Sequence, residues 1–218
     1  MGKNIIVELT NERIIPSGGL AVVGAILGKS DFVKNCNNMK VDCNHPQHQI
    51  KNGDVLLTYI GMQCMGKPSF DAVHEMDDDP DFYKAALGIC YGIPSAETLR
   101  QRLDLIGSSI RVRILDENVR MLKSNGIVPS KLPCGYVPVD MDVSPFDNSN
   151  TSKEGVSRTY KGCDGYAPMF AYIGSEGYLA NLELREGKQH CQKGTPRFLD
   201  ETINICRQLT DEPLLFRL

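Results

Sequence analysis

Residues 136–142, YVPVDMD, mark the point where the sequence changes from a helical period to an alternating one. Asp140 and Asp142 alternate with the apolar Val139 and Met141, and a period of two predicts a strand. Because side chains two positions apart on a strand share a face, both carboxylates are expected on the same side. Burying two carboxylates is costly unless a cation neutralises them, so the pair is a candidate metal site. The simpler interpretation, a solvated turn or a helix cap, stays open.

The segments that follow this strand predict more of a sheet. Residues 146–162 are polar and predict a loop, whereas GYAPMFAYI (165–173) and GYLANLELR (177–185) flank a tight turn and predict a hairpin. Thr195-Pro196 begins an amphipathic helix. The last run, LLFRL (214–218), is typical of a buried strand. The order is therefore strand, strand, strand, helix, strand, and we expect an interrupted sheet because nothing follows the last strand to cover it.

The segments before residue 127 predict mainly helices. A strand is expected at 3–9, a short apolar helix at 18–28 and a loop at 29–52. Further helices are expected at 54–65, 69–76, 80–87, 95–106 and 109–124. Asp79 followed by Pro80 is a strong helix start, and Ser95 is a candidate N-cap. The predicted fold class is α+β, with a mainly helical region at 1–126 and an α/β unit at 127–218.

Composition limits the classes of function. The net charge is −3, and residues 1–126 hold 14 basic and 15 acidic side chains against 10 and 12 in the remainder. A nucleic-acid partner would therefore need a local basic patch. The start lacks the pattern of a secretory signal, and the longest weakly polar stretch, 18–28, is too short to span a bilayer. We expect a cytoplasmic protein with reduced thiols and no membrane partner.

Three stretches of this sequence resemble bacterial insertion-sequence transposases of the DDE type. They are VPVDMDVSPFDNSNTSKEGVSRTYKGCDGYAPMFAYIG, ELREGKQHCQKGTP and, in the helical half, IPSAETLRQRLD. The resemblance extends over nearly the whole chain. It implies a ribonuclease-H-like catalytic core, which has the same order of strand, strand, strand, helix, strand. It also implies a nucleoid-associated bacterial enzyme that hydrolyses the 3′ ends of the element and joins them to target DNA.

The resemblance also implies the catalytic residues. Asp142 would be a catalytic metal ligand on the first strand, and Asp140 would support it without binding the ion. The cofactor would be two Mg²⁺ ions, for which Mn²⁺ can substitute. In this family a strand like LLFRL runs into an Asp-Ser-Gly segment that supplies the second ligand, and a Glu much further on supplies the third. We therefore expect a truncated core that is inactive alone.

Basic residues supply the candidate DNA contacts. Two loops of the α/β unit carry Lys153, Arg158, Lys161, Lys188, His190 and Lys193. The helix that begins after Ser95 would be the reading element for the terminal repeats, with Arg100 and Arg102 exposed. Ordinary solvated loops and packed helices are the competing interpretations. Transposases of this type usually act as dimers on paired ends, so a homodimer is expected of the complete protein.

One further cluster and one further function stay open as alternatives. Cys36, Cys43, His45 and His48 lie close together in the chain, but their spacing matches no common zinc pattern, so incidental Cys and His residues are favoured. The alternative function is a non-catalytic DNA-binding regulator or a remnant derived from a transposase. Reading the source DNA beyond codon 218 would separate these possibilities.

Overall fold

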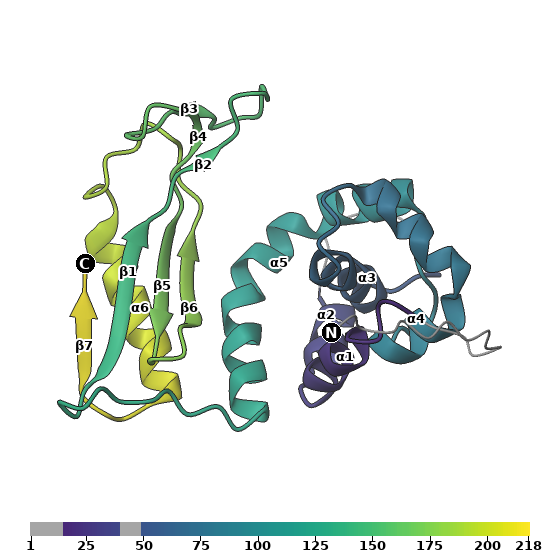
Figure 1. The fold of residues 1–218 in the computed structure, drawn as a ribbon, viewed down its shortest axis with the longest axis horizontal. Helices are drawn as coiled ribbons and strands as arrows, with labels where there is room; N and C mark the ends of the chain where they lie inside the picture. Colours follow the sequence, from purple (N-terminus) through teal and green to yellow (C-terminus); the bar gives the residue numbers. More distant parts are fainter. Residues whose placement is uncertain (1–14, 40–48) are drawn as a thin grey trace, which may run out of the picture.

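The computed structural model describes residues 15–39 and 49–218, except for the side chains of residues 108, 111 and 112. Residues 3–9, predicted as a strand, lie outside this part. The fold class is α+β, as predicted, with a group of helices on one side, a sheet on the other and a long helix between them (Figure 1). No helix in the described part of the chain has the length and apolar character needed to cross a bilayer.

Six helices form the first part of the chain as far as residues 15–39 and 49–124 are described. They are α1 (Leu20–Gly28), α2 (Phe32–Asn37), α3 (Asn52–Cys64), the 3-10 helix η1 (Phe70–Asp78), α4 (Pro80–Leu87) and α5 (Ala96–Ser124). Helix α3 lies at the centre, with positions 52–58 all buried. Its apolar side chains share one core with residues from α1, α2, η1, α4 and the start of α5. The prediction of a loop at 29–52 was wrong in part, since α2 lies within it.

The predicted helix starts are confirmed by their capping bonds. The Asp79 side chain accepts a hydrogen bond from the Phe82 N–H, and Gly88 ends α4 at a φ of 77°. The Ser95 hydroxyl accepts from the Thr98 N–H at the start of α5. The two helices expected at 95–106 and 109–124 are one helix, because Gly107 costs only about 1 kcal/mol relative to Ala and does not stop a well-packed helix.

A four-stranded sheet forms the second part. Its strands are β1 (Val137–Val143), β5 (Met169–Ile173), β6 (Tyr178–Glu183) and β7 (Leu214–Arg217), in the order β6-β5-β1-β7. β1 is antiparallel to β5 and parallel to β7. Helix α6 (Thr195–Leu209) connects β6 to β7 and packs on one face of the sheet, where Phe198 and Cys206 meet the buried side chains of β1 and β5. Along the chain, β1, β5, β6, α6 and β7 follow one another in the predicted order of strand, strand, strand, helix, strand.

A second, three-stranded sheet modifies the predicted connections. It consists of β2 (Phe146–Asp147), β4 (Asp164–Tyr166) and β3 (Ser157–Arg158), so residues 146–162 are not all loop. The segment expected as one strand at 165–173 is divided at Ala167-Pro168. The prediction of a buried strand at 214–218 was also wrong: β7 is at the edge of the described sheet, only one of its faces meets α6, and Leu215 is 37% exposed.

Helix α5 joins the two parts. Its second half contacts β6 and α6, and the Asn118 amide donates to the Leu179 carbonyl at 2.7 Å. An apolar pocket of about 380 Å³ lies along this contact, lined by residues of α1, α2, α3, α5 and β6 that include Val23, Ile114 and Leu182.

Candidate active site and nucleic-acid interface

The two carboxylates of the predicted site project from β1, a central strand of the main sheet. Val137, Val139 and Met141 point into the core with at most 3% exposure, so Asp140 and Asp142 lie on the opposite face, away from α6. Their cross-strand neighbours on β5 are aromatic, with Tyr172 opposite Asp140 and Phe170 opposite Asp142. The alternation read from the sequence is therefore correct, and both acids share one exposed face.

Asp140 is held by Arg217 of β7, its register partner on the neighbouring parallel strand. The guanidinium donates to both carboxylate oxygens, from Nε to Oδ1 and from Nη2 to Oδ2, the second at 2.6 Å. These bonds and the charge of Asp140 raise the pKa of Arg217. The sequence prediction gave Asp140 a supporting position behind the metal ligand, and in the structure it is the partner of an arginine.

Asp142 is exposed at the carboxyl-terminal end of β1. Its Oδ1 accepts a hydrogen bond from the backbone N–H of Val143 at 2.7 Å. The Tyr160 hydroxyl donates to the Val143 carbonyl at 3.4 Å and so lies beside this strand end. The carboxylate is therefore accessible to a solute from the open face of the sheet.

Aromatic rings line the open face next to the acids. The ring centroids of Phe146 and Phe170 lie 5.8 Å apart, and those of Phe170 and Tyr172 lie 6.0 Å apart with nearly parallel planes. Phe146 is 50% exposed and Tyr172 is 39% exposed. The carboxylates thus stand at the border of an apolar surface that α6 does not cover.

The oxygen donors on this face suit a hard cation such as Mg²⁺, which binds through one or two carboxylates and keeps several waters or phosphate oxygens. Asp142 supplies one such carboxylate. No group of three His, Cys, Asp or Glu side chains able to hold a metal is found in residues 15–39 and 49–218. Asp142 is thus one exposed carboxylate, and the described residues around it do not form a metal site.

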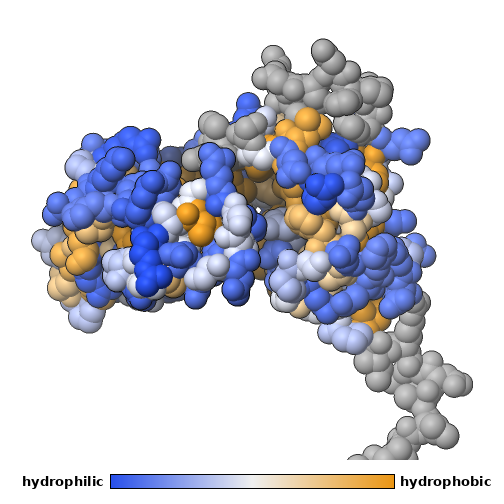
Figure 2. Space-filling model, turned by 90° about the horizontal axis from the view of Figure 1, so that it is seen from above, coloured by the Kyte–Doolittle hydropathy of each residue, from blue (hydrophilic) through white to orange (hydrophobic). Residues whose placement is uncertain are grey.

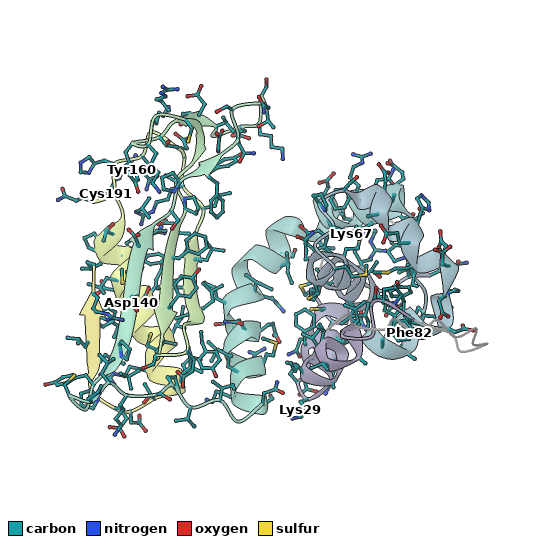
Figure 3. All side chains as sticks on the ribbon, in the orientation of Figure 1. Lys29, Lys67, Phe82, Asp140, Tyr160 and Cys191 are labelled. Atoms are coloured by element: carbon teal, nitrogen blue, oxygen red, sulfur yellow. The ribbon has the colours of Figure 1, made fainter. Side chains whose placement is uncertain are left out.

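The two basic loops predicted to contact DNA lie side by side near the carboxyl-terminal end of β1. The Lys188 N–H donates to the Ser157 hydroxyl at 3.0 Å, and the Gly187 N–H donates to the Gly155 carbonyl at 3.4 Å. Figure 3 labels one residue of each loop, Tyr160 and Cys191. All six predicted residues are exposed: Lys153, Arg158, Lys161, Lys188, His190 and Lys193. Seen from above, this end of the molecule is mostly hydrophilic (Figure 2).

Acidic neighbours offset part of this positive charge. Arg158 lies 3.6 Å from Asp164, and Lys188 lies 3.5 Å from Glu186. Lys161 lies over the Tyr160 ring, 6.0 Å from its centroid. Exposed pairs of this kind are weak, so the cations remain able to exchange their partners for phosphate.

Arg185 holds the second basic loop in place, and the sequence prediction missed it. Its side chain is buried, bonds Glu183 and the Cys191 carbonyl, and lies over the Phe198 ring. A buried cation of this kind fixes the loop against the start of α6. The signal in the sequence was its position two residues after the end of β6, between Glu183 and Glu186.

The predicted reading helix needs a correction. Arg102 was expected to be exposed, but it is 7% exposed and donates to the Ile50 carbonyl at 3.0 Å and to the Asn52 side chain. It ties α5 to the start of α3 and is not available to DNA. Arg100 is exposed as predicted, but it pairs with Glu97 at 2.7 Å and approaches Asp104 at 3.9 Å.

Of the predicted Cys and His cluster, only Cys36 lies within the described residues. It is buried in α2, and burial, with a smaller contribution from Glu117, raises the pKa of its thiol to about 12. Cys43, His45 and His48 lie outside the described residues. Cys36 itself is placed as a small apolar core residue.

Asp54 is a buried carboxylate that the sequence prediction did not single out. It is fully buried at the start of α3 and accepts hydrogen bonds from the backbone N–H groups of Cys90, Tyr91 and Gly92, at 3.1, 2.6 and 3.0 Å. Through these hydrogen bonds, Asp54 holds the loop between α4 and α5 against the start of α3. Its role is structural.

Comparisons with known proteins do not identify a family for this chain. No family model, no curated protein and no solved structure matches this chain.

Proposed function

We propose that this chain carries the first catalytic aspartate and the DNA-binding part of a DDE transposase with a ribonuclease-H-like core. The reaction would be Mg²⁺-dependent cleavage and transfer of DNA strands at the ends of an insertion sequence. Asp142 would be the metal ligand.

The register of β1 and β7 is the observation that carries this proposal. The two strands are parallel, and Asp140 lies opposite Arg217. Extending the register by two residues puts the position after Leu218 opposite Asp142. In the family that the sequence resembles, this is the position of the second catalytic Asp. Two carboxylates on adjacent strand ends are a suitable arrangement for a shared divalent cation.

Each part of the surface then has a chemical task. Asp142 would orient the ion, and when bound, Mg²⁺ would activate the attacking oxygen and stabilise the leaving oxygen. The adjoining loops at 153–161 and 188–193 would hold phosphates and position the strand without reading its sequence. Arg100 would contribute to binding of the element ends from the start of α5.

Strand cleavage by the full reading frame that encodes these residues tests the proposal. The substrate is a duplex carrying the repeats that flank the coding sequence, with Mg²⁺ and then with EDTA. Asp142→Asn should abolish Mg²⁺-dependent nicking while leaving affinity for the duplex within about twofold. Asp200→Asn, an exposed aspartate on α6, is the matched control and should retain full activity. Unimpaired nicking by Asp142→Asn would exclude the proposed role of Asp142.

A non-catalytic DNA-binding regulator is the second candidate. The observation that favours it is that the described residues form no group able to hold a metal, whereas the basic loops at 153–161 and 188–193 are exposed and joined by hydrogen bonds. A regulator needs neither the metal nor Asp142. Sequence-specific binding to the repeats that is unchanged by EDTA and by Asp142→Asn, with no nicking by the full reading frame, would select it.

A further inference from the structure

Three aromatic rings form a row on the face of the main sheet that α6 does not cover (Figure 1). Phe170 and Tyr172 alternate on β5 with the fully buried Ala171, so both rings stand on the side opposite α6. Their planes are within 12° of parallel. Phe146 of β2 extends the row, with its centroid 5.8 Å from that of Phe170. The row therefore runs from the middle of the sheet to the carboxyl-terminal end of β1, where the basic loops lie.

The exposure of this row indicates a binding surface. Phe146 is 50% exposed and Tyr172 is 39% exposed. Leu182, the register partner of Phe170 on β6, is 42% exposed and continues the apolar surface across the sheet. Apolar side chains scattered singly over a surface are common, but a contiguous exposed group of them marks a place where a partner binds.

The charges around the row limit what that partner can be. Asp142 lies opposite Phe170 in the strand register, so a phosphate placed directly over the rings would be repelled. Cations stand beyond the end of the row instead, where Lys161 and Lys188 are exposed on the two basic loops. The first loop reaches β1 through the Tyr160 hydroxyl, which donates to the carbonyl of the last residue of that strand. The partner should therefore present uncharged flat groups to the rings and negative charge to the loops.

Single-stranded DNA has both properties. Every base has a π face that can stack on an aromatic side chain, while the phosphates follow a basic groove or loop. Duplex DNA does not offer these faces, since its bases are stacked on one another and must be unpaired before a protein ring can reach them.

We propose that Phe146, Phe170 and Tyr172 form a stacking surface for unpaired bases of single-stranded DNA, whose phosphates the basic loops hold. This inference rests on the proposed function and deepens it, because it names the form of DNA that lies beside Asp142. The competing occupant of the row is a second copy of the chain.

Two short fluorescent oligonucleotides of equal length test the stacking surface by anisotropy. One is an oligothymidylate and the other is abasic, so both carry the same phosphates but only the first has bases. The wild type should bind the thymidine probe at least about tenfold more tightly, which is the effect of one stacked base. A double variant with Phe170→Leu and Tyr172→Leu keeps apolar side chains but loses two rings, and its preference should fall to about threefold or less.

Tyr136→Leu is the matched control for the loss of a ring. Tyr136 is 45% exposed and precedes β1 at the opposite end of that strand from the basic loops. This variant should keep the wild-type preference for the thymidine probe. A wild type that binds both probes equally overturns the inference, as does a leucine double variant that keeps the full preference. Circular dichroism checks that the variants remain folded.

A tryptophan in the row gives a second readout that needs no loss of binding. The chain contains no Trp, so Tyr172→Trp introduces a single indole fluorophore. This variant should bind the thymidine probe within about twofold of the wild type, because a larger ring still stacks. Saturating thymidine probe should quench its emission, whereas the abasic probe should not, and Tyr136→Trp should respond to neither. Unchanged emission of Tyr172→Trp with saturating thymidine probe overturns the inference.

Two further measurements separate the stacking surface from the alternatives. If light scattering shows a wild-type dimer that the leucine double variant converts to a monomer, with the base preference unchanged, the row is an interface between copies and the inference is overturned. Loss of base preference in that variant together with unimpaired nicking by Asp142→Asn supports the stacking surface and excludes the proposed role of Asp142. The reverse pair of results overturns the stacking surface alone.

Discussion

At the scale of single residues, the best-defined polar contact is that of Asp54 with the loop before α5. Three backbone N–H groups point at one fully buried carboxylate. Replacing Asp54 with Ala removes the acceptor and leaves these donors without it, so we expect a loss of about 2–3 kcal/mol in the free energy of unfolding. Urea denaturation of the variant and the wild type measures this difference in the free energy of unfolding. Asp200→Ala, on the exposed face of α6, should change stability by less than about 0.5 kcal/mol. A loss below about 1 kcal/mol for Asp54→Ala would show that the loop is held by other contacts.

Two buried thiols give a second prediction at the same scale. Burial raises the pKa of Cys36 to about 12 and that of Cys206 to about 11. Because the thiolate is the reactive form, both should resist alkylation at pH 8, whereas the exposed Cys64 and Cys191 should react. Peptide mass spectrometry after a timed iodoacetamide pulse, with and without urea, makes the comparison. Rapid native labelling of Cys36 would contradict its burial.

The same shifts predict how stability depends on pH. In the unfolded chain a thiol ionises with its ordinary pKa of about 9.0, while the folded protein keeps Cys36 and Cys206 protonated to higher pH. Their contribution is therefore fully present below pH 9 and is lost as pH rises from 9 towards 12. A Cys206→Ala variant should show a flatter decline of the unfolding free energy across this window than the wild type.

At the scale of the elements, two glycines in helices have opposite roles. A Cβ at Gly24 of α1 would lie 1.9 Å from the Ala86 carbonyl oxygen, whereas one at Gly107 of α5 meets nothing within 4 Å. Gly107→Ala should therefore stabilise the protein by up to about 1 kcal/mol through helix propensity alone. Gly24→Ala should destabilise it by more than about 1 kcal/mol, because α1 and α4 must move apart. Thermal unfolding of both variants measures these changes in stability. Stabilisation by Gly24→Ala would contradict the close packing of α1 on α4.

Local chemistry explains which elements the sequence predicts correctly. The capping residues Asp79 and Ser95 and the end at Gly88 need only near neighbours in the chain, and the helices begin and end there. The alternating pattern at 136–142 likewise predicts that Asp140 and Asp142 lie on one face of the strand, and they do. The burial of Arg102 could not be read this way, because its two acceptors lie 52 and 50 positions earlier in the chain.

Pairing between distant strands explains what was missed at the candidate site. Arg217 reaches Asp140 only because β7 is parallel to β1 in one particular register, 77 positions along the chain. The sequence signal was present, as an arginine in an otherwise apolar strand. Without the register, nothing links that arginine to one aspartate more than to another.

At the scale of the whole molecule, a net charge of −3 coexists with a basic end on the sheet part. Lys161 and Lys188 come from two loops that hydrogen bonds join beside β1. If this end meets DNA, affinity must fall steeply with salt, since phosphate contacts release counterions. Replacing both lysines with Gln should lower the slope of log affinity against log salt by about 1.5–2 and weaken binding similarly for every duplex sequence. Fluorescence anisotropy with two unrelated duplexes measures both quantities.

The control for this surface is a pair of lysines on the helical part, away from the basic loops. Lys29 and Lys123 are also exposed, near the carboxyl-terminal ends of α1 and α5, and the Asn125 amide donates to the Ile26 carbonyl there. Replacing both with Gln makes the same change in net charge but leaves the basic loops intact. The salt slope should then stay within about 0.5 of the wild-type value. An equal loss in both double variants would mean that DNA responds to overall charge, and the paired loops would lose their assignment as the binding surface.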